Sequence, residues 1–300
     1  MAKKKQNQPG VQRSQFGEIW HRLCKNRSAM LGLVILVIII FLALTADILF
    51  DEELVTLQNA KIRNLSPNAI NPLTETKYGR FGTDCYGRDI LTRTVYGARV
   101  SLTIGFLGAA ISLVIGATFG SISAYYGGKV DNIIMRVMDM LMAIPTTLMA
   151  LCLVAALGRS TYNLLLAIAL ANMPSFTRLV RSSILTVVDM EYVEAARACG
   201  MRDRDIIFKE ILPNAIGPII VQTTQSIAGM ILEASALSFI GMGVQLPTPE
   251  WGAMISEARE FLRQYPYMMV YPGLAILLTS LSFNLLGDGL RDAFDPRLKD

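Results

Sequence analysis

The sequence has little charge and few of the residues with which soluble enzymes work. Only 17% of its 300 residues are Asp, Glu, Lys or Arg, and 52% are hydrophobic, whereas charged residues make up about a quarter of a soluble domain. It contains a single histidine, His21, so a histidine metal cluster or a Ser-His-Asp triad lacks its partners. The composition excludes a disordered chain and a nucleic-acid binder, and we predict neither a metal site nor a catalytic residue.

Cysteine is also scarce, and its spacing excludes a disulfide-rich secreted module. Four cysteines are present, none in a CxxC pair: Cys24, Cys85, Cys152 and Cys199. On the predicted topology only Cys85 lies on the outer side of the membrane, so we expect no disulfide within the outer segments. We interpret the four as small packing residues.

Long uncharged runs are what the sequence has in abundance. Six stretches of at least 18 residues contain no Asp, Glu, Lys or Arg: 28–46, 100–128, 140–158, 160–177, 211–232 and 264–287. Each is long enough to cross a hydrocarbon core about 30 Å thick as a helix. We therefore predict an all-α polytopic protein of the lipid bilayer with six transmembrane helices.

Basic residues set the orientation of these spans. Six crossings place both termini on one side, where the tails and inner loops hold 18 Lys and Arg residues, against ten in the outer segments. By the positive-inside rule both termini are cytoplasmic. The chain then divides into a tail with an interfacial helix (1–27), a first transmembrane helix (28–50), an outer loop (51–99), a five-helix core (100–290) and a second tail (291–300).

The segment before the first span has an amphipathic pattern. Phe16, Ile19, Trp20 and Leu23 recur at helical spacing among charged residues. This pattern predicts a short helix lying along the inner membrane interface, with an unstructured basic tail as the alternative. Because the first apolar run follows a long polar leader, we expect a retained anchor and not a cleaved signal.

Glycines and prolines within the spans indicate a closely packed, bent bundle. Small residues let helices approach each other, and the second run holds four glycines: Gly105, Gly108, Gly116 and Gly120. Pro145 and Pro174 fall within the third and fourth spans and Pro218 one turn into the fifth, where each should kink its helix.

Acidic residues near the membrane are few. Glu233 lies toward the outer end of the fifth span, Asp139 before the third and Asp288 at the end of the sixth. A carboxylate at membrane depth normally faces the bundle interior or water. Glu233 is therefore a candidate pore or gate residue, with a hydrogen-bond partner at a helix interface as the alternative. We interpret the two aspartates as interfacial.

The inner loop 178–213, which we call the coupling segment, has the pattern of two short helices. Residues 192–199 are rich in alanine and end at Gly200, which tolerates a left-handed helix cap. Asp203 is placed to cap a second helix over 204–212 that should stop at Pro213. We predict a stiff helical elbow joined at both ends to transmembrane helices.

Such an elbow suits a docking partner. Alanine side chains let another protein pack closely, and charged neighbours fix its orientation: Arg197, Arg202, Asp203 and Arg204. A partner that moves the elbow also moves the fourth and fifth spans. The alternative is a helical hairpin that packs only against its own chain.

Six positions of the elbow resemble the EAA loop of permease subunits of bacterial ABC importers. The pattern is E-A-A-x3-G-x9-I-x-L-P, and the matching residues are Glu194, Ala195, Ala196, Gly200, Leu212 and Pro213. Glu210 stands where isoleucine is usual.

Two further stretches narrow this resemblance to the second permease of dipeptide, oligopeptide and nickel importers. The first is similar to a G-T-D-x-x-G-R-D run before the second span, and we call its residues the outer motif: Gly82, Asp84, Gly87, Arg88 and Asp89. We expect a tight turn there with an internal Asp–Arg pair. The other stretch runs from Glu233 to Gly252.

The resemblance implies a type I ABC importer permease fold in the bacterial cytoplasmic membrane. It implies pairing with a homologous second permease, two ABC ATPase subunits bound through the coupling segment, and an extracytoplasmic substrate-binding protein. The sequence contains no G-x-x-x-x-G-K-[ST] loop, so ATP and Mg should be bound by the partners and no cofactor by this chain. The implied function is non-enzymatic import of di- and oligopeptides by alternating access.

Other functions remain open at this point. The same mechanism serves nickel chelates, glutathione-like compounds or short sugars in related importers, and a proton-driven secondary transporter is a further alternative. The outer segments 51–99 and 242–263 are long enough to form a receptor platform. Trp251, Tyr265 and Tyr267 are candidates for that platform or for membrane-interface anchors.

Overall fold

Residues 15–70, 72 and 81–294 are described by a computed structural model, and within them the chain is helical apart from loops and one isolated bridge between Thr83 and Asp89. The helices in chain order are α1 (Gln15–Lys25), α2 (Arg27–Leu44), α3 (Ala46–Leu49), α4 (Glu53–Thr56), η1 (Ala60–Ile62), α5 (Ile90–Tyr126), α6 (Gly128–Met142), α7 (Thr146–Leu157), α8 (Thr161–Leu185), α9 (Glu191–Ala198), α10 (Asp203–Asp205), the π-helix η2 (Ile206–Ile211), α11 (Leu212–Phe239), α12 (Trp251–Ala258), η3 (Arg259–Phe261) and α13 (Tyr267–Phe294).

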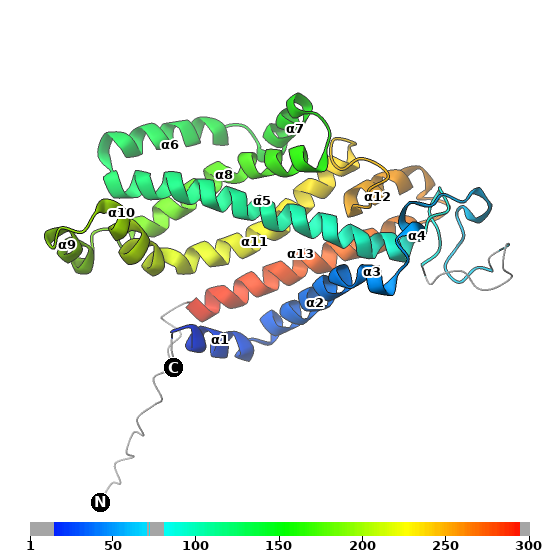
Figure 1. Ribbon diagram of the computed structural model, residues 1–300, viewed down its shortest axis with the longest axis horizontal. Helices are drawn as coiled ribbons and strands as arrows, with labels where there is room; N and C mark the ends of the chain where they lie inside the picture. The colour runs from blue at the N-terminus through cyan, green and yellow to red at the C-terminus, as the bar shows by residue number, and fades with distance from the viewer. Residues whose placement is uncertain (1–14, 71, 73–80, 295–300) are drawn as a thin grey trace, which may run out of the picture.

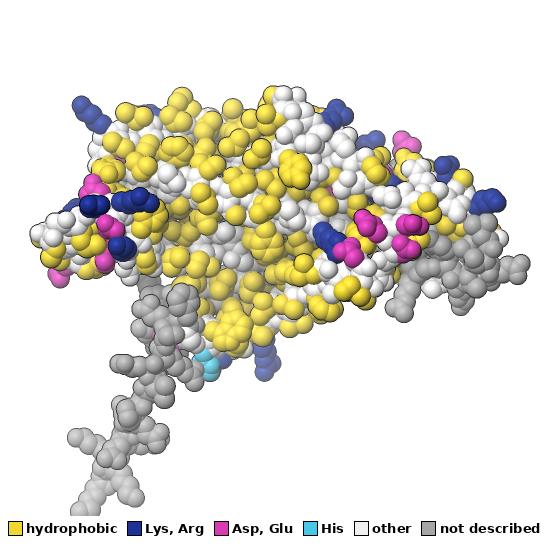
Figure 2. Space-filling model, viewed as in Figure 1, with side chains coloured by type: hydrophobic (Ala, Val, Ile, Leu, Met, Phe, Trp, Pro, Cys, Tyr) yellow, Lys and Arg dark blue, Asp and Glu magenta, His cyan; other side chains and the backbone are white. Residues whose placement is uncertain are grey.

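The long helices form the predicted membrane bundle. Five helical stretches among the described residues are long and apolar enough to cross a membrane, and the bent pair α6 and α7 makes a sixth if it is one span. Long helices run along the long axis of the molecule (Figure 1). Hydrophobic side chains cover most of the middle of the visible face, and charged ones gather toward its ends (Figure 2). The all-α, polytopic prediction is confirmed.

The two ends of the bundle hold different parts of the chain. The short helices α9 and α10 lie at one end, and α4 and α12 lie at the other (Figure 1). The amphipathic helix α1 is formed as predicted, with Leu23 buried and Trp20 exposed. It packs against α13, and the Asn26 amide donates to Asp292 near the end of that helix. The unstructured alternative is therefore wrong for residues 15–25.

The third span is broken where the sequence predicts only a kink. We expected one helix over 140–158, but α6 and α7 meet at an angle of 85°. Pro145 lies in the break and precedes the first residue of α7. Because proline lacks an N–H and disfavours a helical residue before it, the chain turns there and starts a new helix.

Several helices extend beyond the uncharged runs. Helix α5 begins at Ile90, inside the predicted outer loop, and α8 continues to Leu185, inside the predicted coupling segment. The first span instead ends early, at Leu44. Charged side chains such as Arg93 and Arg181 lie on the extensions, so the limits of an uncharged run do not mark the ends of a helix.

Pro213 does not end the second coupling helix, contrary to prediction. The chain is helical from Asp203 to Phe239, with a π-helical turn just before the proline, where the Leu212 N–H donates to the Ile207 carbonyl. Proline cannot donate, and its ring crowds the carbonyl four residues earlier. The wider turn gives that ring room and keeps the helix continuous.

Glycines bring α5 and α8 into close contact, as the sequence predicts. A Cβ on Gly116 would lie 2.6 Å from the Phe176 Cβ, and one on Gly120 would lie 2.7 Å from the Thr177 carbonyl oxygen. No side chain larger than hydrogen fits at these crossings. The two helices therefore pack backbone to backbone at the centre of the bundle.

Candidate functional site: the coupling segment and the outer motif

Gly200 ends α9 in the conformation that its sequence predicts. Its φ is +75°, and its N–H donates to the Arg197 carbonyl while the Met201 N–H donates to the Ala196 carbonyl. This pair of bonds is the Schellman cap, which requires a left-handed residue. No atom lies within 4 Å of a Cβ built on Gly200, so the corner is open to a partner.

The EAA residues divide into an exposed tip and a buried base. Glu194 and Ala195 are exposed, whereas Ala196 is buried. Ala196 belongs to a hydrophobic cluster with Val193 and Ile206, which seats α9 against the start of the next helix. Farther along, Leu212 is half-buried and Pro213 exposed. The elbow is thus packed against its own chain through α9 and η2 and still presents a free surface.

Asp203 does not cap the second helix, which corrects the sequence prediction. It is the first residue of α10, and no side chain caps that helix. Its carboxylate instead accepts hydrogen bonds from the hydroxyls of Tyr125 and Tyr126, at 2.8 and 3.2 Å. Arg197 stacks its guanidinium 4.9 Å from the centre of the Tyr125 ring. Asp203 and Arg197 therefore contact α5 of the same chain, in addition to any contact they make with a docking partner.

Two other charged residues of the coupling segment remain exposed. Arg202 precedes α10, and Arg204 lies in its first turn, with its guanidinium 6.0 Å from the centre of the Phe208 ring. Both are therefore available to the electrostatic docking that the sequence suggests.

The outer motif forms the predicted turn with its internal ion pair. Gly82 and Gly87 have φ values of +80° and +81°. The Arg88 guanidinium lies 2.6 Å from the Asp84 carboxylate, and the other carboxylate oxygen of Asp84 accepts the Arg88 backbone N–H. Asp89 then caps α5 by accepting from the Thr92 N–H at 2.7 Å. The motif fixes where the long helix begins.

The sequence reasoning missed the partner that anchors this turn. Glu257, on α12, accepts from Arg88 at 2.7 Å and lies 3.4 Å from Arg93. Arg88 and Arg93 each expose 1% of their side chains, so these charges are held in the protein interior. No local spacing reveals a contact between residues so far apart in the chain.

Glu250 is a second acidic residue that the sequence reasoning did not single out. It is fully buried and caps α12 by accepting from the N–H groups of Gly252 and Ala253. The hydroxyls of Ser101 and Ser235 lie 3.2 and 3.3 Å from the same carboxylate. Glu250 thereby joins α5, α11 and α12, and because glutamate is not among the preferred N-cap residues, nothing in the local sequence marked it.

Two aromatic residues proposed as interface anchors serve as internal supports. Trp251 exposes only 1% of its surface and donates its indole N–H to the Thr94 carbonyl. The Tyr267 hydroxyl donates to the Leu65 carbonyl at 2.9 Å. The anchor interpretation is wrong for Trp251, whose ring is enclosed by protein.

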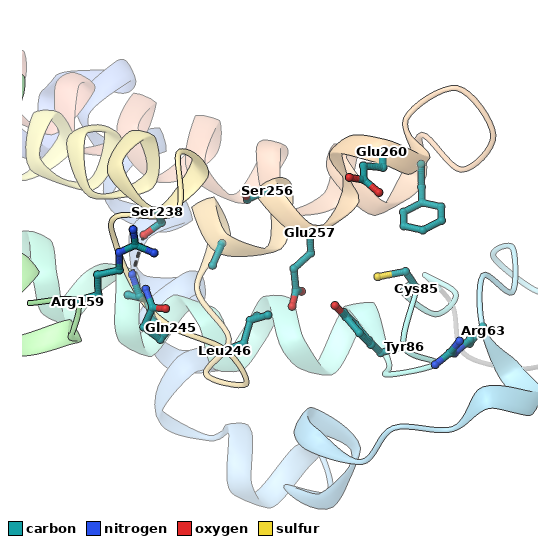
Figure 3. A pocket seen from close by; sticks show the side chains of 14 residues that line it. Arg63, Cys85, Tyr86, Arg159, Ser238, Gln245, Leu246, Ser256, Glu257 and Glu260 are labelled. Atoms are coloured by element: carbon teal, nitrogen blue, oxygen red, sulfur yellow. Dashed lines mark hydrogen bonds between the residues drawn. The ribbon is translucent and has the colours of Figure 1, made fainter. Parts of the chain in front are cut away.

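A cavity of about 560 Å³ opens between the outer segments. Its walls carry charge of both signs, from Arg63, Arg159, Glu257 and Glu260. Arg159 and Arg63 stand at opposite sides, with Glu257 between them (Figure 3). Cys85 also lines it, and burial, helped by the nearby Asp84 and Glu257 charges, raises the pKa of this thiol to about 11. The space suits a small polar ligand or an inserted side chain.

Glu233 lies away from this cavity, between α8 and α11. It is half-buried and accepts a hydrogen bond from the Asn172 amide at 2.9 Å. The same amide also donates to the Ile168 carbonyl. The structure thus provides the helix-interface partner named as one of the two alternatives. Within residues 15–70, 72 and 81–294, no three His, Cys, Asp or Glu side chains gather as they would around a metal ion.

Comparison with known proteins gives consistent matches. Residues 92–300 match the family described as binding-protein-dependent transport system inner membrane component, and residues 14–67 match the N-terminal transmembrane domain of oligopeptide transport permease C. The chain is 44% identical over 286 residues to the dipeptide transport system permease protein DppC of Alkalihalophilus pseudofirmus, covering 95% of this chain and 91% of that one.

More distant relatives carry other names. The chain is 38% identical to the glutathione transport system permease protein GsiD of Pectobacterium atrosepticum, over 96% of this chain and 93% of the relative. An inward-facing structure of the MetNI methionine ABC transporter superposes with a TM-score of 0.57 at 16% identity, covering 69% of this chain and 98% of that chain. The chain therefore belongs to the family of binding-protein-dependent transport system inner membrane components, and its fold is that of a type I ABC importer permease.

Proposed function

We propose that this chain is the permease subunit through which an ATP-driven importer moves di- and oligopeptides across the bacterial cytoplasmic membrane. The observation that carries the proposal is the exposed EAA tip at Glu194 and Ala195, held rigidly between α8 and α11. Relatives named as dipeptide permeases support the substrate class. The subunit itself catalyses no reaction in this proposal.

Two ABC ATPase subunits supply the energy, and ATP and Mg are bound there. One of them grips the open corner at Gly200, while Arg202 and Arg204 set its orientation. When the ATPases close, the coupling segment moves, and α8 and α11 move with it because all three are one continuous stretch of chain. The bundle then alternates between inward-open and outward-open packings, each favoured by a different ligand state.

A homologous second permease completes the pathway. Helix α6 supports such pairing, since it turns apolar side chains outward, among them Val130, Ile133, Val137 and Met140. The break at Pro145 leaves this helix standing apart from α7. A second copy of the fold would cover these apolar side chains.

An extracytoplasmic binding protein delivers the substrate to the outer end. The cavity beside Glu257 and Glu260 supports this role, because its mixed charge suits an inserted polar side chain or the substrate itself. On this orientation both termini and the coupling segment are cytoplasmic. The joint placement of α1, α9 and the end of α13 toward one end of the bundle supports it (Figure 1).

Reconstitution tests the proposal. The chain is purified with the second permease, two ATPases and binding protein encoded beside it, and ATP hydrolysis is measured in proteoliposomes. We expect a dipeptide to stimulate hydrolysis and to accumulate inside, and both effects to vanish when this subunit is omitted. Accumulation driven by a proton gradient without ATP would instead establish the secondary-transporter alternative.

A second substrate class has its own support. A relative named as a glutathione permease is 38% identical. The same proteoliposomes are therefore given glutathione, a nickel–histidine chelate and a disaccharide at matched concentrations. If one of these stimulates hydrolysis more strongly than any dipeptide, the peptide assignment fails and the importer mechanism stands.

A further inference from the structure

We propose that Tyr125 and Tyr126 link the coupling segment mechanically to α5, so that α5 carries its motion to the outer motif. This inference rests on the proposed function, in which ATPases move the coupling segment. It assigns a transmission role to two tyrosines that no sequence motif marks.

Helix α5 packs along α8, and the tyrosine pair adds a direct contact between α5 and the elbow itself. The coupling segment continues directly into α8 on one side and α11 on the other. Helix α5 has no such covalent connection, since it ends at Tyr126 and the chain turns away through Gly127 and Gly128, whose φ values are +60° and +52°. Two glycines with positive φ in sequence form a sharp corner, so the chain does not run from α5 into α9 or α10, and side-chain contacts join the inner end of α5 to those two helices.

Those contacts are specific and come from both coupling helices. Each oxygen of the Asp203 carboxylate takes one hydroxyl, from Tyr125 at 2.8 Å and from Tyr126 at 3.2 Å. From α9, Arg197 covers the face of the Tyr125 ring. Hydrogen bonds to a charged carboxylate are stronger than neutral ones, and two donors on one group also fix its direction. The tyrosine pair therefore holds α9 and α10 together.

Apolar packing reinforces the same junction. Ala124, the residue before the tyrosines, is buried in one cluster with Val193 and Ala196 of α9 and Ile206 of η2. Tyr125 packs against this cluster from its edge. The inner end of α5 thus packs against the buried base of the elbow.

The other end of α5 is equally fixed. The helix is 37 residues long, which corresponds to about 55 Å at 1.5 Å per residue. At its outer end Arg93 lies 3.4 Å from Glu257 and the Thr94 carbonyl accepts from Trp251. A displacement of Asp203 is therefore carried along the continuous helix α5 to α12, which lines the cavity.

The test uses variants that remove hydroxyls and leave rings in place. In the reconstituted assembly, Tyr125→Phe with Tyr126→Phe keeps the ring beneath Arg197 and removes both donors to Asp203. The matched control is Tyr162→Phe, which removes the hydroxyl of a tyrosine on α8 that is 81% exposed. We expect basal ATP hydrolysis to stay within about twofold and peptide-stimulated hydrolysis to fall about tenfold, as expected for lost charge-assisted bonds.

A mutant cycle of Asp203 and the two tyrosines distinguishes transmission of motion from a purely structural role. Asp203→Ala should lower peptide stimulation by a similar factor, and the triple variant should be no worse than either alone, because all three remove one interaction. A purely structural role predicts less assembled complex and a lower melting temperature with an unchanged ratio of stimulated to basal hydrolysis. That unchanged ratio overturns the inference.

A distance measurement tests the link in the chain with both tyrosines intact. Spin labels are placed by Thr118→Cys on α5 and Glu191→Cys on α9, both exposed, after the four natural cysteines are replaced by serine. We expect the distance between the labels to be the same with and without ATP, and to become ATP-dependent in Asp203→Ala. A distance that changes with ATP in the chain with both tyrosines rejects a rigid link.

The two proposals fail differently. If no peptide stimulates hydrolysis by the unaltered assembly, the proposed substrate class fails. The spin-label distances measured with and without ATP still test the link in that case. If the unaltered assembly responds to peptide and the double tyrosine variant responds equally, the link alone is wrong.

Discussion

The Arg88 guanidinium lies 2.7 Å from the Glu257 carboxylate, a contact between residues 169 positions apart in the sequence. Arg88 also holds Asp84, inside its own turn. The turn that precedes α5 is therefore joined to α12 by an ion pair, and the side chains of Arg88 and Glu257 are both nearly excluded from water. Removing Glu257 leaves two buried guanidinium groups, those of Arg88 and Arg93, with Asp84 as their one remaining carboxylate in this network.

Glu257→Ala should accordingly destabilise the end of the bundle that carries the outer motif. We expect a loss of about 3–5 kcal/mol in the free energy of unfolding, typical of a broken buried ion pair, and a lower melting temperature in detergent. Glu260→Ala, which removes an exposed carboxylate three residues later, is the control and should change the melting temperature little. Equal melting temperatures for the two variants would show that the buried pair contributes no net stability.

The Cys85 thiol should be unusually slow to alkylate. Burial first, and then the negative charges of Asp84 and Glu257, raise its pKa to about 11. At pH 8 about one thiol in a thousand is then ionised, against about a quarter of an ordinary thiol, and the thiolate is the reactive form.

The measurement uses iodoacetamide and a chain in which the other three cysteines are serine. The alkylation rate of Cys85 at pH 8 should be at least about 100-fold below that of a cysteine placed by Glu53→Cys in a chain whose natural cysteines are all serine. The Cys85 rate should also keep rising as the pH approaches 11. A rate that levels off near pH 9 would contradict the raised pKa.

The sequence predicts local features of this protein well, because their causes lie within a few residues. The Gly200 cap follows from an alanine-rich run that ends in glycine, and the Asp84–Arg88 pair follows from a four-residue spacing. Membrane spans follow from long uncharged runs, although charged extensions hide where each helix ends.

Features set by distant parts of the chain escape the sequence. Nothing near Asp203 indicates that Tyr125 and Tyr126 take its carboxylate and prevent a helix cap. Because proline has no N–H, Pro213 predicts the end of the helix, yet a π-helical turn just before it lets the helix continue. The first is a tertiary contact and the second a local change of helix type, and residue spacing reveals neither.

Gly200 should be essential for coupling but not for insertion. Its φ of +75° disfavours β-branched residues by about 1–2 kcal/mol. We expect Gly200→Val to abolish peptide uptake and peptide-stimulated ATP hydrolysis while the chain still inserts in membranes. Gly200→Asn, which adopts the left-handed conformation more easily, is the matched control and should keep part of the activity. Uptake by Gly200→Val at the parental rate would exclude the elbow as the coupling site, as would parental uptake by Glu194→Lys.

Close packing between α5 and α8 should make Gly116 intolerant of even one methyl group. A Cβ there would lie 2.6 Å from the Phe176 Cβ and 2.8 Å from the Thr177 nitrogen. Gly116→Ala should cost about 1–3 kcal/mol through overpacking and lower the melting temperature. Gly229→Ala places the same methyl where no atom lies within 4 Å and should leave the melting temperature unchanged or slightly higher. An equal response of the two variants would rule out backbone-to-backbone packing at this crossing.

Glu233 provides the test of whether charge or hydrogen bonding matters inside the bundle. One of its oxygens accepts from the Asn172 amide, which ties α11 to α8. A glutamine carbonyl accepts the same bond without the charge. If the residue is a helix-interface partner, Glu233→Gln should transport within about twofold of the parental rate, since the hydrogen bond survives, whereas Glu233→Ala should transport more slowly and melt earlier. Initial rates of dipeptide uptake in proteoliposomes, normalised to inserted protein, decide between the two interpretations. A large loss in Glu233→Gln with an unchanged melting temperature would instead assign the carboxylate to the pore or its gate, because glutamine keeps the shape of the side chain and the hydrogen bond from Asn172 but lacks the charge and one acceptor oxygen.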